Sequence, residues 1–209
     1  MVMMLQVPKP SLVLNVDLVS DTEEGTLIAR AKVEPEAFGL LYQKYVKRIY
    51  NYAYQFTRNR EDAEDLTSRT FYQALRGIGV YSDRGLPFQA WLFRIAHNLV
   101  VNWYRDQSRH PVIGLDHIED EMRSEDGNPQ ADLAQSEERR KLLQIISGLS
   151  EDRKTLLILK FVEKMSNAEI ARVLGRSEGA IKVLYHRTLL SLREKVDSEW
   201  QGGKDVLVT

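Results

Sequence analysis

Residues 166–187 constrain the fold more than any other stretch, because their pattern is that of two short helices joined by a glycine turn, a helix-turn-helix. Residues 167–174 carry apolar side chains at helical spacing, which predicts a first helix with one buried face. Gly175 can adopt the left-handed backbone conformation that ends a helix. Ser177 can accept a backbone N–H and so begin the second helix. The apolar positions of the first helix are Ile170, Ala171 and Leu174.

The second helix of this pair carries donors and acceptors of the kind that read base edges in a DNA major groove. They are Glu178, Lys182, Tyr185, His186 and Arg187. Many helix pairs joined by a glycine turn bind no nucleic acid. This segment therefore favours DNA binding without establishing it, and support has to come from the rest of the chain.

The chain has a formal net charge of −1, but its charges are unevenly distributed. Residues 116–138 contain nine acids and one base, a net charge of −8. Residues 139–198 contain thirteen bases and seven acids, a net charge of +6. An acidic segment therefore precedes a basic C-terminal unit, and a basic unit is suited to a nucleic-acid partner.

The residue types present exclude several classes of function. The chain has no cysteine, which excludes disulfides, cysteine-based zinc sites and thiol catalysis. Its four histidines show no metal-ligand spacing, and neither a G-x-S-x-G motif nor a glycine-rich phosphate loop is present. We therefore expect no enzymatic activity, no metal and no cofactor.

The N-terminal segment and the hydropathy of the chain predict its location. Residues 1–20 are mildly apolar, but Lys9, Pro10 and Asp17 interrupt them, so a signal peptide is not expected. No run of about 18 apolar residues occurs, so we expect no membrane-spanning helix. These features predict a cytoplasmic protein without membrane insertion.

The pattern of apolar residues predicts an all-α protein with two small helical domains. Residues 23–109 form the first domain, with three long amphipathic segments. Residues 110–136 are acidic, contain glycine and proline, and have few apolar residues, which predicts a flexible linker. Residues 137–198 form the second domain, which ends in the helix-turn-helix. The predicted tails are residues 1–22 and 199–209.

Two further helices are expected in the second domain before the helix-turn-helix. Residues 142–146 are predicted to lie on the first of them. Ser150 is expected to cap the second, whose apolar side chains extend to Phe161 and Val162.

The predicted helix of residues 88–109 is a second candidate for nucleic-acid contact. Beside its buried stripe lies a face with cations, an amide and aromatic rings. Cations contact phosphates and aromatic rings stack on unpaired bases, so this face suits melted or single-stranded nucleic acid. A core tryptophan beside an ordinary solvated cationic face has the same pattern. The candidate residues of this helix and of the loop before it are Tyr81, Arg84, Trp91, Arg94, Asn98 and Arg105.

Four motifs in order resemble the bacterial sigma-70 family, and in particular its extracytoplasmic-function group. They are DAEDL followed by Phe71, then FQAWLFRIAHN, LSEDRKTLLILK and AEIARVLGRSEGAIKVLYHR, with the acidic segment between the second and the third. The resemblance covers roughly residues 24–196. It implies a sigma region 2 bundle and a sigma region 4 helix-turn-helix joined by the acidic linker. It also implies a factor that binds core RNA polymerase and directs initiation by recognising −35 and −10 promoter elements and melting the DNA.

The resemblance also implies which residues meet which partner. The six candidates of residues 81–105 match the element that recognises and melts the −10 region. The positions that match the contact with the clamp helices of the largest polymerase subunit are Asp62, Glu64, Asp65, Leu66 and Phe71. Those that match the −35 surface are Lys160, Arg176, Ser177, Glu178, Lys182, Val183, His186 and Arg187. The family further implies contact with the polymerase flap and an anti-sigma factor as a partner.

Two places depart from the family pattern. Ser68 and Arg69 stand where many relatives have Gln-Glu, which puts a base in place of an acid beside the polymerase contact. Val183 and Leu184 stand where many relatives have Ser-Arg, which removes a cation from the recognition helix.

The alternative function is that of a conventional helix-turn-helix regulator, which binds duplex operator DNA without being a polymerase subunit. Such a regulator would not need Trp91 and Asn98 near melted DNA.

Overall fold

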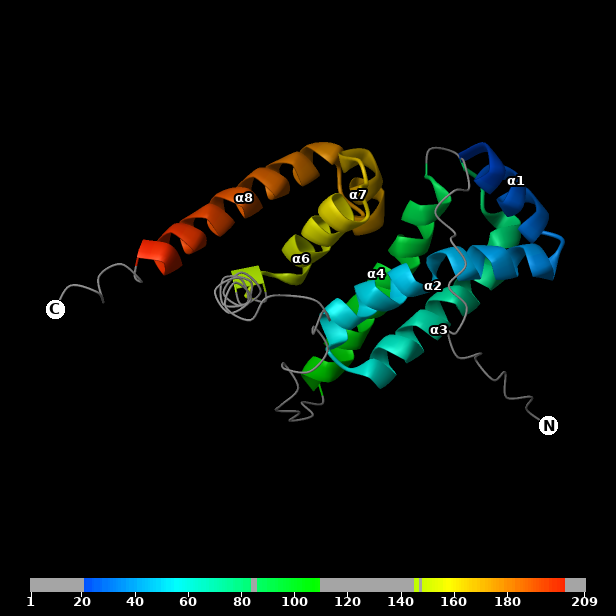
Figure 1. Ribbon diagram of the computed structural model, residues 1–209, viewed down its shortest axis with the longest axis horizontal. Helices are drawn as coiled ribbons and strands as arrows, with labels where there is room; N and C mark the ends of the chain where they lie inside the picture. Colours follow the sequence, from blue (N-terminus) through cyan, green and yellow to red (C-terminus); the bar gives the residue numbers. More distant parts are fainter. Residues whose placement is uncertain (1–20, 84–85, 110–144, 147, 202–209) are drawn as a thin grey trace, which may run out of the picture. The chain divides into compact units, whose positions relative to one another are not determined.

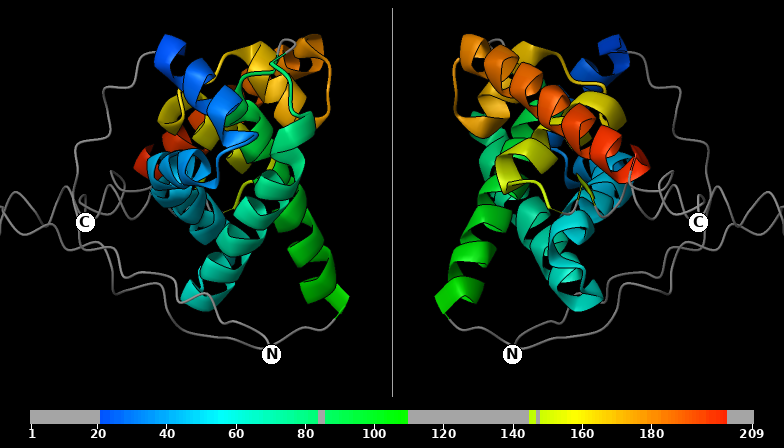
Figure 2. Two further views of the ribbon diagram at one scale, coloured as in Figure 1. Left: turned by 90° about the vertical axis from the view of Figure 1, so that its right-hand side faces the viewer. Right: turned by 90° about the vertical axis from the view of Figure 1, so that its left-hand side faces the viewer.

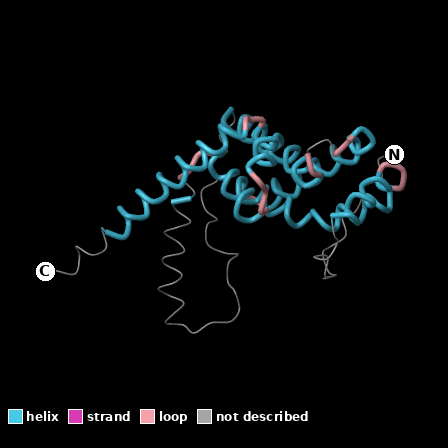
Figure 3. Tube along the Cα trace, turned by 90° about the horizontal axis from the view of Figure 1, so that it is seen from above, coloured by secondary structure: helices cyan, strands magenta, loops and turns pink. Residues whose placement is uncertain are grey.

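The computed structural model describes residues 21–83, 86–109, 145–146 and 148–201 (Figure 1). Within these ranges the chain forms helices and loops and no strand, as Figure 3 shows, so the predicted all-α class is confirmed. The linker at 110–136 and most of both tails lie outside the described residues. The helices are α1 (Asp21–Ala31), α2 (Pro35–Thr57), α3 (Arg60–Gly77), η1 (Ile78–Val80), α4 (Phe88–Arg109), α6 (Glu151–Leu157), η2 (Ile158–Val162), α7 (Asn167–Leu174) and α8 (Glu178–Gln201).

The chain divides into two compact units, Met1–Tyr45 and Val46–Thr209, with the boundary inside α2. In the first unit, Glu24 ties α1 to α2. Its carboxylate accepts hydrogen bonds from Lys44 Nζ at 2.5 Å and from the Tyr45 hydroxyl at 2.7 Å. Leu41 and Tyr45 are almost completely buried, which gives α2 the apolar face that its three-four spacing predicts.

In the second unit, the C-terminal half of α2 packs on α4. The rings of Tyr52 and Phe93 meet edge to face with centroids 5.4 Å apart, and the Tyr104 hydroxyl donates to the Phe56 carbonyl at 3.1 Å. Helix α3 also packs against α4. Figure 2 shows α3 (teal) and α4 (green) close together at one end and diverging at the other. These contacts make α4 the central helix of this part of the protein.

Tyr81, which precedes α4, is fixed by a hydrogen bond and by aromatic packing. The Tyr81 hydroxyl donates to the Leu86 carbonyl at 2.8 Å. The Tyr81 ring lies 5.7 Å from that of Phe88 and 4.8 Å from that of Trp91. Tyr81 is therefore held against the first turn of α4.

The helix-turn-helix has the local structure that its sequence predicts. Ser166 and Glu169 form a capping box at the start of α7. The Glu169 N–H donates to Ser166 Oγ at 3.2 Å, and the Ser166 N–H donates to Glu169 Oε2 at 2.7 Å. Gly175 ends α7 with φ of 63°, a left-handed conformation that branched residues resist. The Ser177 hydroxyl accepts the Ala180 N–H at 3.2 Å and begins α8. The predicted first helix, turn and second helix are confirmed.

Four fully buried side chains form the core around this motif, and each contributes about 1.5–3 kcal/mol by burial. They are Leu156, Leu159, Ile170 and Ile181. Because these residues come from α6, η2, α7 and α8, burial of their side chains fixes the recognition helix against the segment that precedes it.

The segment before α7 differs from the sequence prediction. Ser150 stands at the start of α6, but its side chain makes no capping hydrogen bond. Helix α6 continues into η2, a five-residue π-helix. Phe161 and Val162, which the sequence places in the body of the same helix as Leu156, are 49% and 68% exposed. The wider π turn shifts the register of the residues that follow it, which accounts for their outward position. Of the helix predicted at 142–146, only 145–146 are described.

Candidate functional site

The first half of α8 is the exposed face of the helix-turn-helix. Ile181 and Thr188 are fully buried and determine which side of α8 faces outward. Lys182 Nζ lies 2.9 Å from Glu178 Oε1, an exposed pair that contributes at most about 1 kcal/mol. Within the described part of the chain Arg187 makes no ion pair, so its guanidinium can take up a phosphate or a base edge. The exposed candidates are Ser177, Glu178, Lys182, Val183, His186 and Arg187.

Lys160 and Arg176 belong to the same predicted surface but have partners inside the protein. Lys160 Nζ donates to Asn167 Oδ1 at 3.0 Å, which ties η2 to the first residue of α7. Arg176 forms an ion pair with Asp152 of α6. Both cations therefore help to position the helix-turn-helix in this structure, and each keeps further N–H donors that can contact DNA.

Helix α4 brings three of the predicted −10 candidates to one exposed surface. Arg94, Asn98 and Arg105 are exposed, and Arg105 donates to the side chain of Asn102. Their spacing of four and seven residues places them along one side of the helix. Asn98 makes no hydrogen bond within the described ranges, so its amide is available to a base edge.

The aromatic candidates near the start of α4 have different exposures. Trp91 is half-buried and leaves part of its ring at the surface. Its indole packs against Gly77, where an added Cβ would lie only 3.2 Å from the Trp91 ring. Tyr81 is 6% exposed and supports Trp91 from behind. The structure thus places Trp91 at the surface and Tyr81 in the core, and Arg84 lies outside the described residues.

The predicted polymerase contacts on α3 also separate into two groups. Glu64 and Asp65 are exposed and Asp62 is half-buried near the helix start. Leu66 and Phe71 are 1% and 5% exposed, so they pack in the core and cannot present their side chains to a partner.

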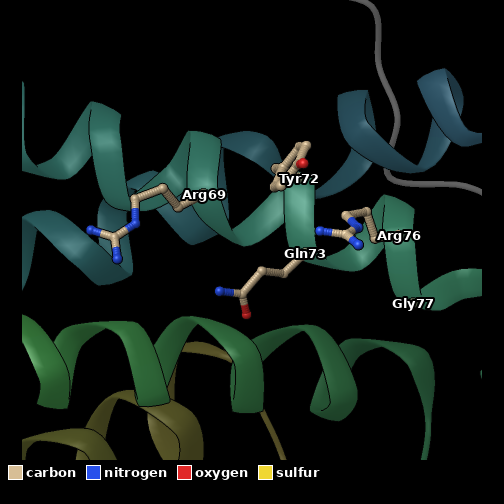
Figure 4. Close-up of a pocket in the computed structure, with 5 residues that line it drawn as sticks. All are labelled: Arg69, Tyr72, Gln73, Arg76 and Gly77. Atoms are coloured by element: carbon tan, nitrogen blue, oxygen red, sulfur yellow. The ribbon is translucent and has the colours of Figure 1, made fainter.

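An exposed groove on α3 was not singled out from the sequence. Figure 4 shows the residues that line it along one side of the helix. Tyr72 is 61% exposed, and the Arg76 guanidinium lies 5.8 Å from its ring centroid, a cation–π arrangement. The spacing of four between Tyr72 and Arg76 is the signal that could have identified it. The lining residues are Arg69, Tyr72, Gln73, Arg76 and Gly77.

Two buried polar side chains lie beneath the α4 surface. The Tyr52 hydroxyl is 3.1 Å from His97 Nδ1 and 3.4 Å from Thr155 Oγ1. Burial is the main cause that lowers the pKa of His97 below its ordinary value of 6.5, so the ring is neutral at pH 7. Burial likewise raises the pKa of the Tyr52 hydroxyl, which stays protonated.

In the described ranges, histidine and acidic side chains do not gather in groups of three that could hold a metal ion. None of the helices seen in the structure combines the length and the apolar character that crossing a membrane requires.

Comparison with known families gives two matches in sequential order. Residues 41–110 match the model of sigma-70 region 2, and residues 139–192 match that of sigma-70 region 4. Among curated proteins, the chain is 36% identical over 167 residues to the ECF RNA polymerase sigma factor BldN of Streptomyces coelicolor. This match covers 79% of the chain and 63% of BldN. The RNA polymerase sigma factor YlaC of Bacillus subtilis is 29% identical over 75% of the chain and 90% of its own length.

Two solved structures have a similar fold. CnrH, solved with the cytosolic domain of CnrY, has a TM-score of 0.60 and 25% identity, and the match covers 83% of this chain and 96% of that one. The sigma factor RpoE of Bartonella quintana, solved with the anti-sigma factor NepR, also has a TM-score of 0.60. Its identity is 20%, and the match covers 77% of this chain and 96% of RpoE, so it supports the fold alone. With region 2 preceding region 4 and ECF sigma factors among its relatives, the chain belongs to the sigma-70 family, in its extracytoplasmic-function group.

Proposed function

We propose that this chain is a transcription initiation factor that binds core RNA polymerase, recognises −35 and −10 promoter elements and melts the DNA, without catalysing a reaction of its own. The observation that carries the proposal is the presence of two separate exposed faces, one on α8 and one on α4, in an ECF sigma fold. One has the side chains of a duplex reader, and the other those of a single-strand binder.

The α8 face reads the −35 element in this proposal. The first turns of α8 enter the major groove, where Lys182, His186 and Arg187 reach base edges or phosphates. Val183, 51% exposed, offers an apolar contact to a thymine methyl group. Arg176 contacts a backbone phosphate with its remaining N–H donors. Ser177 and Glu178 lie at the helix start, and Lys160 holds α7 in place through Asn167.

The α4 face binds the melted −10 element. Asn98 contacts the edge of an extruded base, and the exposed part of Trp91 stacks on an unpaired base. Arg94 and Arg105 bind phosphates along the same side of the helix. Tyr81 acts indirectly, by supporting the Trp91 ring, and Arg84 is a further candidate for phosphate contact.

The exposed acids of α3 dock on the polymerase clamp helices, and Leu66 and Phe71 position them from the core. We also propose a region 2 domain at 23–109 and a region 4 domain at 137–198, joined by a linker at 110–136. The chain further contacts the polymerase flap and acts in the cytoplasm. CnrH, which is 25% identical to this chain, was solved with the cytosolic domain of CnrY, and the resemblance to the extracytoplasmic-function group implies an anti-sigma factor, so we also propose an anti-sigma partner for this chain.

Transcription with purified bacterial core polymerase tests the proposal against the alternative of a duplex-binding regulator. Promoters are selected from a random DNA library, and transcripts are mapped with and without the chain. The proposal predicts defined start sites only when both proteins are present. Operator binding without any transcript that depends on the chain would favour the regulator and reject the initiation factor.

A further inference from the structure

The two most exposed acids at the start of α3 are each paired with an arginine of the same helix. Arg60 Nε donates to Glu64 Oε1 at 2.8 Å. Arg69 Nη1 donates to Asp65 Oδ2 at 3.3 Å. Both pairs join residues four positions apart, which are neighbours on a helix surface. All four side chains are more than half exposed, so the pairs lie where a partner protein would touch α3.

The order of these side chains around the helix puts an arginine on each side of the acids. At 3.6 residues per turn, Glu64 is rotated by roughly 40° from Arg60, and Arg69 by roughly 40° from Asp65. The acids therefore form a strip with one arginine at each edge. Arg69 also lines the α3 groove, and Figure 4 shows its side chain extending away from Arg76, towards the start of the helix.

The arginines change how this strip meets a partner. A protein surface that binds carboxylates presents cations, and a cation next to a like charge raises the free energy of the complex. Arg60 and Arg69 bring the net charge of the four side chains to zero and put two positive charges beside the contact. Exposed ion pairs contribute little to stability, so these pairs affect association more than folding.

We propose that Arg60 and Arg69 weaken the docking of α3 on core polymerase, and that Arg69 is the main determinant of this lowered affinity. Arg69 has the larger effect because it also borders the groove and stands where many relatives have an acid. The inference deepens the proposed function and rests on its polymerase contact. The effect of Arg69 is indirect, since it acts through the carboxylate of Asp65.

The dissociation constant of the full chain for purified core polymerase tests the proposal. The chain has no cysteine, so a fluorescent label can be attached to one added after Thr209, and binding is followed by anisotropy. Arg69→Ala should tighten binding about two- to three-fold at low salt, and Arg69→Glu about five-fold or more. Arg60→Ala should have a smaller effect in the same direction. The gains should shrink between 0.1 M and 1 M salt, as the screening length falls from about 10 Å to about 3 Å.

An exposed ion pair elsewhere in the chain provides the matched control. Arg193 and Asp197 of α8 are four positions apart, with Arg193 Nε 3.7 Å from Asp197 Oδ2. Arg193→Glu removes this pair and changes the net charge as Arg69→Glu does. It should leave the affinity for polymerase unchanged. Circular dichroism checks that the helix content is native in every variant.

A double-mutant cycle tests whether Arg69 acts through Asp65. Asp65→Asn should weaken binding less than two-fold in the wild-type background, where Arg69 already occupies the carboxylate. In the Arg69→Ala background the same change should weaken binding about five-fold. A purely structural role of Arg69 would give the same effect of Asp65→Asn in both backgrounds, and that result would overturn the proposal.

The remaining outcomes separate this inference from the proposed function. Unchanged or weaker binding by folded Arg69→Ala and Arg69→Glu chains would overturn the inference and leave the polymerase contact in place. A gain that does not diminish at high salt would also overturn it, because the proposed effect is electrostatic. If neither the wild type nor any variant binds core polymerase, the proposed function is rejected and the inference falls with it.

Discussion

The buried hydroxyl of Tyr52 offers a quantitative test of how α2 and α4 are joined to α6. Tyr52 is 1% exposed, and its hydroxyl meets His97 Nδ1 at 3.1 Å and Thr155 Oγ1 at 3.4 Å. Tyr52→Phe removes both contacts and keeps the ring. Each hydrogen bond contributes about 0.5–1.5 kcal/mol net, and the partners left unsatisfied in the interior add to the loss. We therefore expect the free energy of unfolding to fall by about 1–3 kcal/mol.

Thermal and urea denaturation measure this change. For a chain of this size, 1 kcal/mol lowers Tm by about 2–4 °C, so a loss of 2 kcal/mol corresponds to about 4–8 °C. Tyr54→Phe is the matched control, because Tyr54 stacks on Tyr50 at 6.0 Å and its hydroxyl makes no hydrogen bond within the described part of the chain. A double-mutant cycle with Thr155→Val should give a coupling energy of at least about 0.5 kcal/mol. Equal stability of the two phenylalanine variants, or no coupling to Thr155, would refute the reasoning.

Three further outcomes are expected. Lys182→Ala and Arg187→Ala should each weaken binding to a −35 duplex, by about 1–3 kcal/mol where the side chain makes a bidentate base contact, as measured by fluorescence anisotropy. Asn98→Ala should reduce permanganate reactivity of the melted −10 region more than it reduces duplex binding, because its amide is proposed to hold an extruded base. Burial lowers the pKa of His97 below 6.5, so below about pH 6.5 the unfolded chain binds more protons than the folded one. The free energy of unfolding should therefore fall with decreasing pH, at up to about 1.4 kcal/mol per pH unit, in urea titrations.

Each of these outcomes has its own control. Glu194→Ala on the exposed side of α8 is the control for the −35 measurements. Unchanged affinity in both cation variants would show that Lys182 and Arg187 do not belong to the recognition surface. If the Asn98→Ala variant melts the −10 region as the wild type does, the Asn98 amide does not hold the extruded base. For the pH dependence, His97→Asn keeps an acceptor for Tyr52 and has no titrating ring. An identical slope below pH 6.5 in that variant would assign the acid sensitivity to other groups.

The parts of the fold that sequence alone predicts are those determined locally. The bounds of α7 follow from the Ser166–Glu169 capping box and from Gly175, all within ten residues. The long amphipathic helices follow from periodicity, which needs no knowledge of the partner that each face meets. Local signals therefore suffice for the helix-turn-helix and for the all-α class.

The remaining features depend on contacts between distant residues. The Arg48–Glu163 pair joins residues 115 positions apart, and no spacing rule predicts such a contact. A motif match also does not distinguish a side chain that meets a partner from one that supports it. Leu66, Phe71 and Tyr81 match positions of functional motifs, yet tertiary packing buries all three. The outward position of Phe161 depends on a π turn whose register change is invisible in the apolar pattern.

The central claim is that this chain gives a bacterial core polymerase its promoter specificity. The most direct measurement mixes the full chain, core polymerase and a selected promoter, isolates the complex by size-exclusion chromatography and footprints its DNA. We expect the chain to co-elute with the polymerase and to protect both the −35 and the −10 elements. A chain that elutes apart from the polymerase, and protects only a duplex site by itself, would contradict the account.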